Sequence, residues 1–81
     1  MTQANQVMET LLFTATPSET VRVAAQRMTE HHVGALLVIE DEKVAGILTE
    51  RDVLDRVVSQ GRDPNGLTVG EVCTREPTAV P

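Results

Sequence analysis

The chain has 81 residues, 41% of them hydrophobic and only one aromatic, so it forms at most one small domain. Its net charge of −5 excludes a non-specific nucleic-acid binder, which needs a basic face to displace counterions. The single cysteine, Cys73, excludes an internal disulfide, is typical of a reducing compartment and is expected to be a small buried hydrophobe. Because we find neither a signal peptide nor a membrane-spanning run, we expect a cytoplasmic protein without a membrane partner.

Residues 13–17, FTATP, predict a short strand that ends at a proline. Ser18 or Thr20 is suited to cap the helix that follows and that we expect to end near Gly34. One face of this helix is apolar, with Val21, Ala24, Ala25 and Met28 at helical spacing. The opposite face is expected to be solvated and carries Arg22, Gln26, Arg27 and Glu30.

Two apolar runs, 35–40 (ALLVIE) and 44–49, are separated by a short polar tip around Asp41 and Glu42. So short a connection predicts a β-hairpin. Gly46 lies inside the second run, where the missing side chain lets a neighbouring backbone approach closely.

A second helix is predicted from Glu50, with an apolar face made of Val53, Leu54, Val57 and Val58. Gly61 lies where a C-terminal cap belongs, and residues 63–66 (DPNG) predict a turn. Residues 68–71 (TVGE) have the capping-box pattern, which predicts a short helical turn that runs to about Cys73.

The order strand, helix, strand, strand, helix predicts an α+β fold, an α/β sandwich with a small three-stranded mixed sheet. The first two strands are expected to be parallel, and the hairpin adds an antiparallel third. Both helices then lie on one face. We expect the other face to be apolar and to carry Leu36, Val38 and Ile47.

The C-terminal residues resemble the N-terminal ones: VCTREPTAVP (72–81) is similar to VMETLLFTATP (7–17). The similarity predicts one whole unit with its lead-in over residues 1–66, and a helical turn with the first strand of a truncated second unit over 67–81. That strand is expected around residues 77–80 and either crosses to a partner or folds back. Because a single unit leaves an apolar sheet face open, we expect a homodimer in which a second copy covers it.

Three segments, TPSETV, HHVGALLVIE and KVAGILTERDVL, carry a resemblance to the CBS family, the regulatory motif named after cystathionine β-synthase. The resemblance covers about residues 7–62, and the tail resembles the start of a second motif. It implies a β-α-β-β-α unit that pairs with another motif and binds adenosyl ligands such as AMP, ATP or S-adenosylmethionine between motifs. It also implies a sensor and no enzymatic activity.

The stretch GILTERD (46–52) is the strongest candidate site. Thr49 ends a strand where free backbone N–H groups suit a phosphate, and Asp52 lies one turn later, where its carboxylate can accept hydrogen bonds from a ribose. We expect both side chains to be open to one cleft, and we expect loss of Asp52 to affect the fold little. A simple N-cap explains Thr49, and an acid favoured at a helix start explains Asp52.

Other candidates follow from the resemblance. Thr14 and Thr16 lie where the family contacts the base or sugar, although β-propensity explains them too. Val33, Gly34 and Ala35 lie where the family lines its adenine pocket. Arg51 is able to reach a phosphate, but an i,i+4 pair with Asp55 explains it equally.

No metal site is expected, because the adjacent His31 and His32 point apart on a helix and are most simply a solvated helix end. We expect no obligate cofactor, only an adenosine nucleotide as a regulatory ligand. The acidic Glu50 favours AMP or a cationic adenosyl ligand over ATP. The alternative function is a dimerisation or interaction module that binds no ligand.

Overall fold

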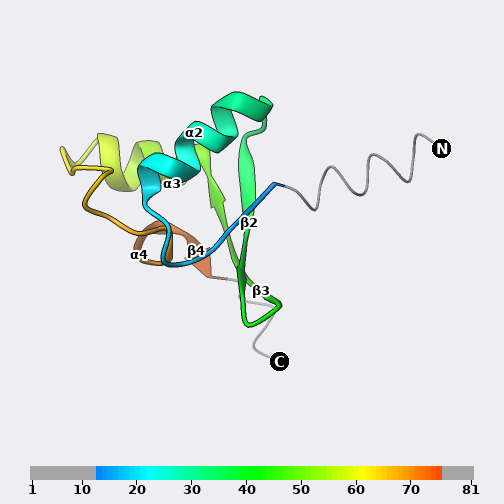
Figure 1. Ribbon diagram of the computed structural model, residues 1–81. Coiled ribbons are helices and arrows are strands. Elements are labelled where there is room, and N and C mark those ends of the chain that lie inside the picture. Colours follow the sequence, from blue (N-terminus) through cyan, green and yellow to red (C-terminus); the bar gives the residue numbers. More distant parts are fainter. Residues whose placement is uncertain (1–12, 76–81) are drawn as a thin grey trace.

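The computed structural model describes residues 13–75, and its sheet contains four strands in the order β1-β2-β3-β4 (Figure 1). The strands are β1 (Thr14–Ala15), β2 (Ala35–Glu40), β3 (Lys43–Thr49) and β4 (Thr74–Arg75). The helices are α2 (Val21–His31), α3 (Glu50–Val53), the π-helix η1 (Leu54–Val58) and α4 (Val69–Val72).

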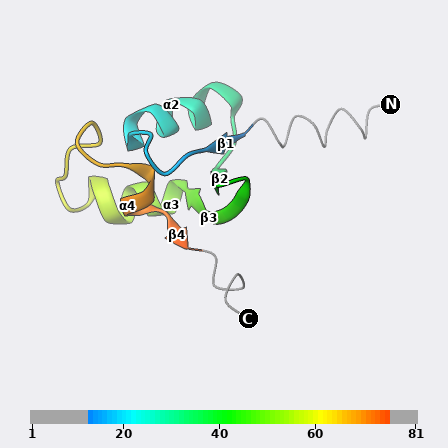
Figure 2. The same ribbon diagram turned by 60° about the horizontal axis from the view of Figure 1, so that its bottom comes forward.

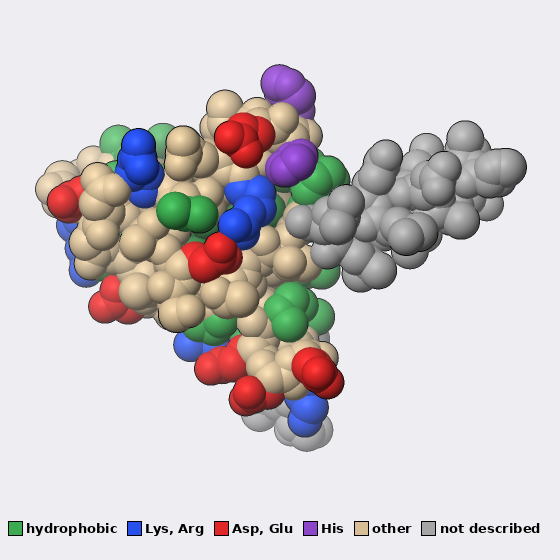
Figure 3. Space-filling view, in the orientation of Figure 1, with side chains coloured by type: hydrophobic (Ala, Val, Ile, Leu, Met, Phe, Trp, Pro, Cys, Tyr) green, Lys and Arg blue, Asp and Glu red, His purple; other side chains and the backbone are tan. Residues whose placement is uncertain are grey.

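The sheet is mixed, as the sequence predicts. β1 is parallel to β2, whereas β2–β3 and β3–β4 are antiparallel. A two-residue turn closes the hairpin, with positive φ at Asp41 (55°) and Glu42 (64°), and acidic side chains gather at this tip (Figure 3). β4 is a fourth strand beyond the three predicted. It folds back onto its own sheet, whereas residues 77–80, where the predicted strand falls, lie outside the described residues.

The core lies between the helices and one face of the sheet, which we call the inner face. Leu36, Val38 and Leu48 point inward and are at most 1% exposed. The prediction that Leu36 and Val38 lie on the open face is therefore wrong. Because strand side chains alternate, Leu37, Ile39 and Ile47 lie on the opposite face, which we call the outer face.

Helix α2 has a defined cap at each end. The Thr20 hydroxyl accepts a hydrogen bond from the Val23 N–H at 3.2 Å, so Thr20 is the cap. At the other end His32 has φ 56°, a left-handed conformation that ends the helix two residues before Gly34. The predicted apolar face is largely correct, since Val21, Ala24 and Met28 are buried.

The second predicted helix differs from the expected amphipathic one. It passes from α3 into η1, whose wider turn is closed by the Ser59 N–H bound to the Leu54 carbonyl at 2.8 Å. This wider turn changes the angular spacing of the apolar residues. Val57 is buried, but Leu54 and Val58 are 55% and 60% exposed, so the predicted four-residue core face is wrong for these two.

The return to the sheet runs through α4. Its capping box is present, because the Glu71 carboxylate accepts the Thr68 N–H at 2.8 Å. Cys73 is buried, as predicted. β4 then passes so close to β3 that a side-chain carbon at Gly46 would lie 2.5 Å from the Thr74 carbonyl oxygen, which explains the glycine. Figure 2 shows β4 following α4 on one side of the molecule and β1 running beside α2 on the other.

Candidate functional site

The strand-to-helix junction brings Thr49 and Asp52 together in a reciprocal capping box. The Thr49 hydroxyl accepts the Asp52 N–H at 3.1 Å, and the Asp52 carboxylate accepts the Thr49 N–H at 3.0 Å. Both groups therefore satisfy backbone donors at the start of α3.

Asp52 has a further partner far away in the chain. The Thr74 hydroxyl on β4 donates to its second carboxylate oxygen at 3.1 Å, and Asp52 is only 8% exposed. The expectation that its carboxylate is open to a cleft is thus not met in the described chain. The physical reason is that β4 returns to the sheet over it. A role of Thr49 and Asp52 in ligand binding remains a prediction.

Arg51 points away from this junction. Its guanidinium pairs with the Asp55 carboxylate at 3.3 Å, four residues along the same helix, and both side chains are exposed, by 82% and 62%. An exposed pair of this kind contributes little to stability. The i,i+4 interpretation of Arg51 is therefore confirmed, and its contact with a phosphate stays a prediction.

The outer face brings several predicted residues to one end of the sheet. The register pairs Thr14 with Leu37, and Ala35 with Thr49. Because paired residues in a sheet share a face, Thr14, Ala35 and Thr49 lie on the same face as Leu37 and Ile47. The outer face is thus apolar in its centre, with threonines on both flanking strands.

An open hollow of about 510 Å³ lies on this face, and we call it the outer hollow. It is lined by the predicted residues Val33, Gly34 and Ala35 and by four residues that the sequence does not predict as ligand-binding, Phe13, Leu36, Leu37 and Ile47. Two signals in the sequence were available for these residues. Phe13 is the chain's one aromatic residue, and strict alternation along the strand 35–40 places Leu37 on the same face as the predicted Ala35.

A second hollow, of about 560 Å³, lies between α2 and α3, and we call it the helix groove. Its walls include Ala25, Met28, Val53 and the exposed Leu54, with Thr29, His32 and Glu50 as polar groups. None of the predicted ligand residues except Val33 contributes to it.

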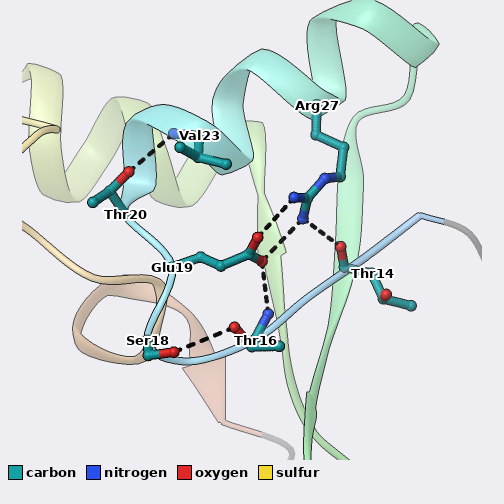
Figure 4. Close-up of polar contacts among 7 residues, drawn as sticks. All are labelled: Thr14, Thr16, Ser18, Glu19, Thr20, Val23 and Arg27. Carbon is teal, nitrogen blue, oxygen red and sulfur yellow. Dashed lines mark hydrogen bonds and ion pairs between the residues drawn. The ribbon is translucent and has the colours of Figure 1, made fainter.

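Thr16 lies just after β1 and belongs to a polar network that the sequence did not indicate (Figure 4). Its N–H donates to the Glu19 carboxylate at 2.9 Å, and Glu19 forms a two-point ion pair with Arg27 at 3.0 and 2.7 Å. The hydrogen bonds from Arg27 and from the Thr16 N–H lower the pKa of Glu19. The prediction that Arg27 is solvated is wrong, because its side chain is only 26% exposed.

His31 and His32 lie at the solvated end of helix α2, as predicted. Both are exposed, and the His31 ring lies against Phe13 with ring centroids 4.7 Å apart. Among residues 13–75, no three His, Cys, Asp or Glu side chains gather in a way that could hold a metal ion. In the same stretch, no helix is both long and apolar enough to cross a membrane.

Comparison with known families agrees with the resemblance in the sequence. The family model described as "CBS domain" matches residues 4–59, which is more than half of the chain. The chain belongs to the CBS domain family. Proteins of this family are generally regulatory or interaction modules.

Two curated relatives illustrate the similarity. The chain is 44% identical over 64 residues to the mitochondrial CBS domain-containing protein CBSX3 of Arabidopsis thaliana, covering 75% of this chain and 31% of the relative. It is 40% identical over 77 residues to the CBS domain-containing protein YhcV of Bacillus subtilis, covering 94% of this chain and 54% of the relative. The chain thus spans about a third to about half of the length of these relatives.

Solved structures share the fold. A cystathionine beta-synthase domain protein fused to a Zn-ribbon-like domain superposes with a TM-score of 0.76 at 34% identity, covering 79% of this chain and 91% of the other. A putative signal-transduction protein with CBS domains from Burkholderia ambifaria superposes with a TM-score of 0.75 at 39% identity, covering 79% and 47%. The predicted family and mixed α/β fold are therefore confirmed.

Proposed function

We propose that this chain is a regulatory module that binds an adenosyl ligand, with the base in the outer hollow and the sugar and phosphate toward Thr49. The observation that supports this most is the outer hollow itself, because its walls are small and apolar, and Thr14 and Thr49 are paired in the sheet with its lining residues Leu37 and Ala35. An apolar wall with few polar groups at its border is typical of small-molecule sites. The proposal includes no catalytic step.

The charge at the border of the hollow favours a ligand with a single phosphate or a cationic group. Glu50 follows Thr49 and lines the helix groove, and its carboxylate lies within 3.4–3.6 Å of the position that a side-chain carbon would take at Gly34. Gly34 is part of the outer hollow. A negative charge at this border repels a polyphosphate, which supports AMP or S-adenosylmethionine over ATP.

The outer hollow is open, and we propose that a second copy of the chain completes it. Leu37 and Ile39 are half-buried in a single chain and Ile47 is 38% exposed, so a second sheet would remove further apolar surface from water. A neighbour of the same fold, the CBS-CP12 protein of bloom-forming cyanobacteria, is described as hexameric. For the present chain we expect a two-fold homodimer.

The ligand is tested by titration calorimetry and thermal shift with AMP, ADP, ATP and S-adenosylmethionine. We expect AMP or S-adenosylmethionine to bind and to raise the melting temperature. Ala35→Leu fills the outer hollow and should abolish binding, whereas Ala25→Leu makes the same change in the helix groove and should not. Binding that survives Ala35→Leu but is lost in Ala25→Leu would place the ligand in the other hollow.

An interaction module without a ligand is the second candidate. It is favoured by the hydrogen bonding of Asp52, because each of its carboxylate oxygens already accepts a hydrogen bond, one from the Thr49 N–H and the other from the Thr74 hydroxyl. In that case the junction acts as structural support, and the outer face serves only association. None of the four compounds would then change the melting temperature at millimolar concentration.

The dimer is tested separately by sedimentation at micromolar concentration, since a monomer has a mass of 8.8 kDa. Ile47→Asp places a charge on the outer face and should yield monomers. Leu54→Asp is the matched control on the helix groove and should leave the dimer intact. The opposite pattern would mean that the chain associates through its helices.

A further inference from the structure

Strand β1 is held by few backbone contacts. It has two residues and lies at the edge of the sheet, next to β2 only. The Leu37 N–H donates to the Phe13 carbonyl at 3.3 Å on the side that faces β2. The opposite edge of β1 faces away from the sheet, and among residues 13–75 no strand pairs with it.

Two side chains occupy that free edge. The Arg27 guanidinium donates to the Thr14 carbonyl at 2.7 Å, and the Glu19 carboxylate accepts the Thr16 N–H at 2.9 Å (Figure 4). The carbonyl of one residue and the N–H of the residue two further on are the groups that an adjacent parallel strand would bind. The ion pair between Arg27 and Glu19 therefore takes the place of a neighbouring strand.

We infer that Arg27 and Glu19 are a positioning pair that fixes β1 at the border of the outer hollow, so that ligand affinity depends on two residues that do not line it. The inference rests on the proposed function. Its basis is that Phe13, which lines the outer hollow, directly precedes the Thr14 carbonyl held by Arg27.

The geometry of the Arg27–Glu19 pair suits a positioning role. Arg27 contacts Glu19 through both terminal nitrogens, at 3.0 and 2.7 Å, and both side chains are about three-quarters buried. A two-point contact between a planar guanidinium and a carboxylate fixes orientation as well as distance. Phe13 is also held from α2, because the His31 ring lies against it. Helix α2 thus holds both Phe13 and Thr14.

The test uses Arg27→Lys, which keeps the charge but removes the planar two-point contact. Arg22→Lys is the matched control, because it makes the same change on the exposed side of the same helix. Titration calorimetry with AMP is run at a temperature at which circular dichroism shows each protein fully folded. We expect Arg27→Lys to weaken AMP binding about tenfold and Arg22→Lys to leave it unchanged.

Amide hydrogen exchange of the ligand-free proteins separates this inference from the proposed function. In Arg27→Lys the amides of Thr16 and Leu37 should exchange faster, while the amide of Leu48 in the core keeps its parent rate. Equal exchange at Thr16 and Leu37, or equal AMP affinity in a parent protein that binds AMP, overturns the positioning role. A parent protein that binds no adenosyl compound refutes the proposed function and the affinity effect together, whatever the exchange rates.

Discussion

Two junctions in this chain have the same local pattern, a threonine followed three residues later by an acid. At Thr68 the box is local, because within residues 13–75 Glu71 accepts hydrogen bonds only from the N–H and hydroxyl of Thr68, at 2.8 and 3.2 Å, and the Glu71 side chain is exposed. At Thr49 the acid is buried, and Asp52 accepts a hydrogen bond from Thr74, 22 residues away.

The difference shows that a capping box need not be only a local device. The box at Thr68 serves the start of α4. The box at Thr49 joins the end of β3, the start of α3 and strand β4, so a change there affects three elements. A buried carboxylate that accepts two hydrogen bonds is costly to remove, because the N–H of the half-buried Thr49 then loses its acceptor at the start of α3.

Asp52→Ala should have the largest effect. It removes the acceptor for the Thr49 N–H and the Thr74 hydroxyl, and we expect the free energy of unfolding to fall by about 3 kcal/mol. This exceeds the roughly 0.3–1 kcal/mol that a helix-start acid alone contributes. Urea unfolding measures the loss, and Glu71→Ala at the exposed box is the control with a smaller one. Equal losses at both sites would remove the contrast between the junctions.

Gly46→Ala should rank second, at about 2 kcal/mol, because the added carbon meets the Thr74 backbone and forces β4 away from β3. β4 carries the hydroxyl that binds Asp52, so the variant separates that contact from the capping box. Gly66→Ala is the control, since its carbon would lie at an ordinary 3.7 Å from the nearest atom, the Asp63 carbonyl oxygen. If thermal unfolding shows the same midpoint for both variants, β4 does not pack as described.

Thr74→Val removes one hydroxyl and nearly preserves shape. One oxygen of Asp52 then loses its protein partner, and we expect a loss of about 1 kcal/mol by urea unfolding. Thr74→Ser keeps the donor and should retain most of the stability. If valine and serine have the same effect, the hydrogen bond to Asp52 contributes nothing measurable.

The smallest expected effect is a change in the pH dependence of stability. The Thr68 N–H and hydroxyl lower the pKa of Glu71 below 4.5, so its stabilising contribution is complete above that value and is lost as pH falls through the lowered pKa. Glu71→Gln should therefore be slightly less stable than the parent at neutral pH and equal to it in strong acid. Thermal unfolding across this range tests the sign, and a difference that grows on acidification would contradict it.

Most of the fold could be predicted because its signals are local. The limits of the second strand agree with the apolar run 35–40, and the turn at Asp41 and Glu42 follows from the short connection. The first helix follows from its apolar spacing and from Thr20. The family resemblance points to Val33, Gly34 and Ala35, which all line the outer hollow, whereas their contact with a ligand stays a prediction.

The wrong predictions have two causes: sequence patterns that fit more than one structure, and contacts between segments that are far apart in the chain. A continuous apolar run does not show which of its residues point inward, so the predicted face of Leu36 is wrong. The π-turn that exposes Leu54 has no clear sequence signal. The burial of Asp52 and the contact of Arg27 with Thr14 depend on chain segments that meet only in the folded protein.

Amide chemical shifts during an AMP titration give the sharpest test of the proposal that the outer hollow binds an adenosyl ligand. We expect saturable shifts at Phe13, at residues 33–37 and at Ile47, with little change at Ala25, Met28 and Leu54 of the helix groove. Shifts that gather at the helix groove, or an unchanged spectrum at millimolar AMP and S-adenosylmethionine alike, would contradict it.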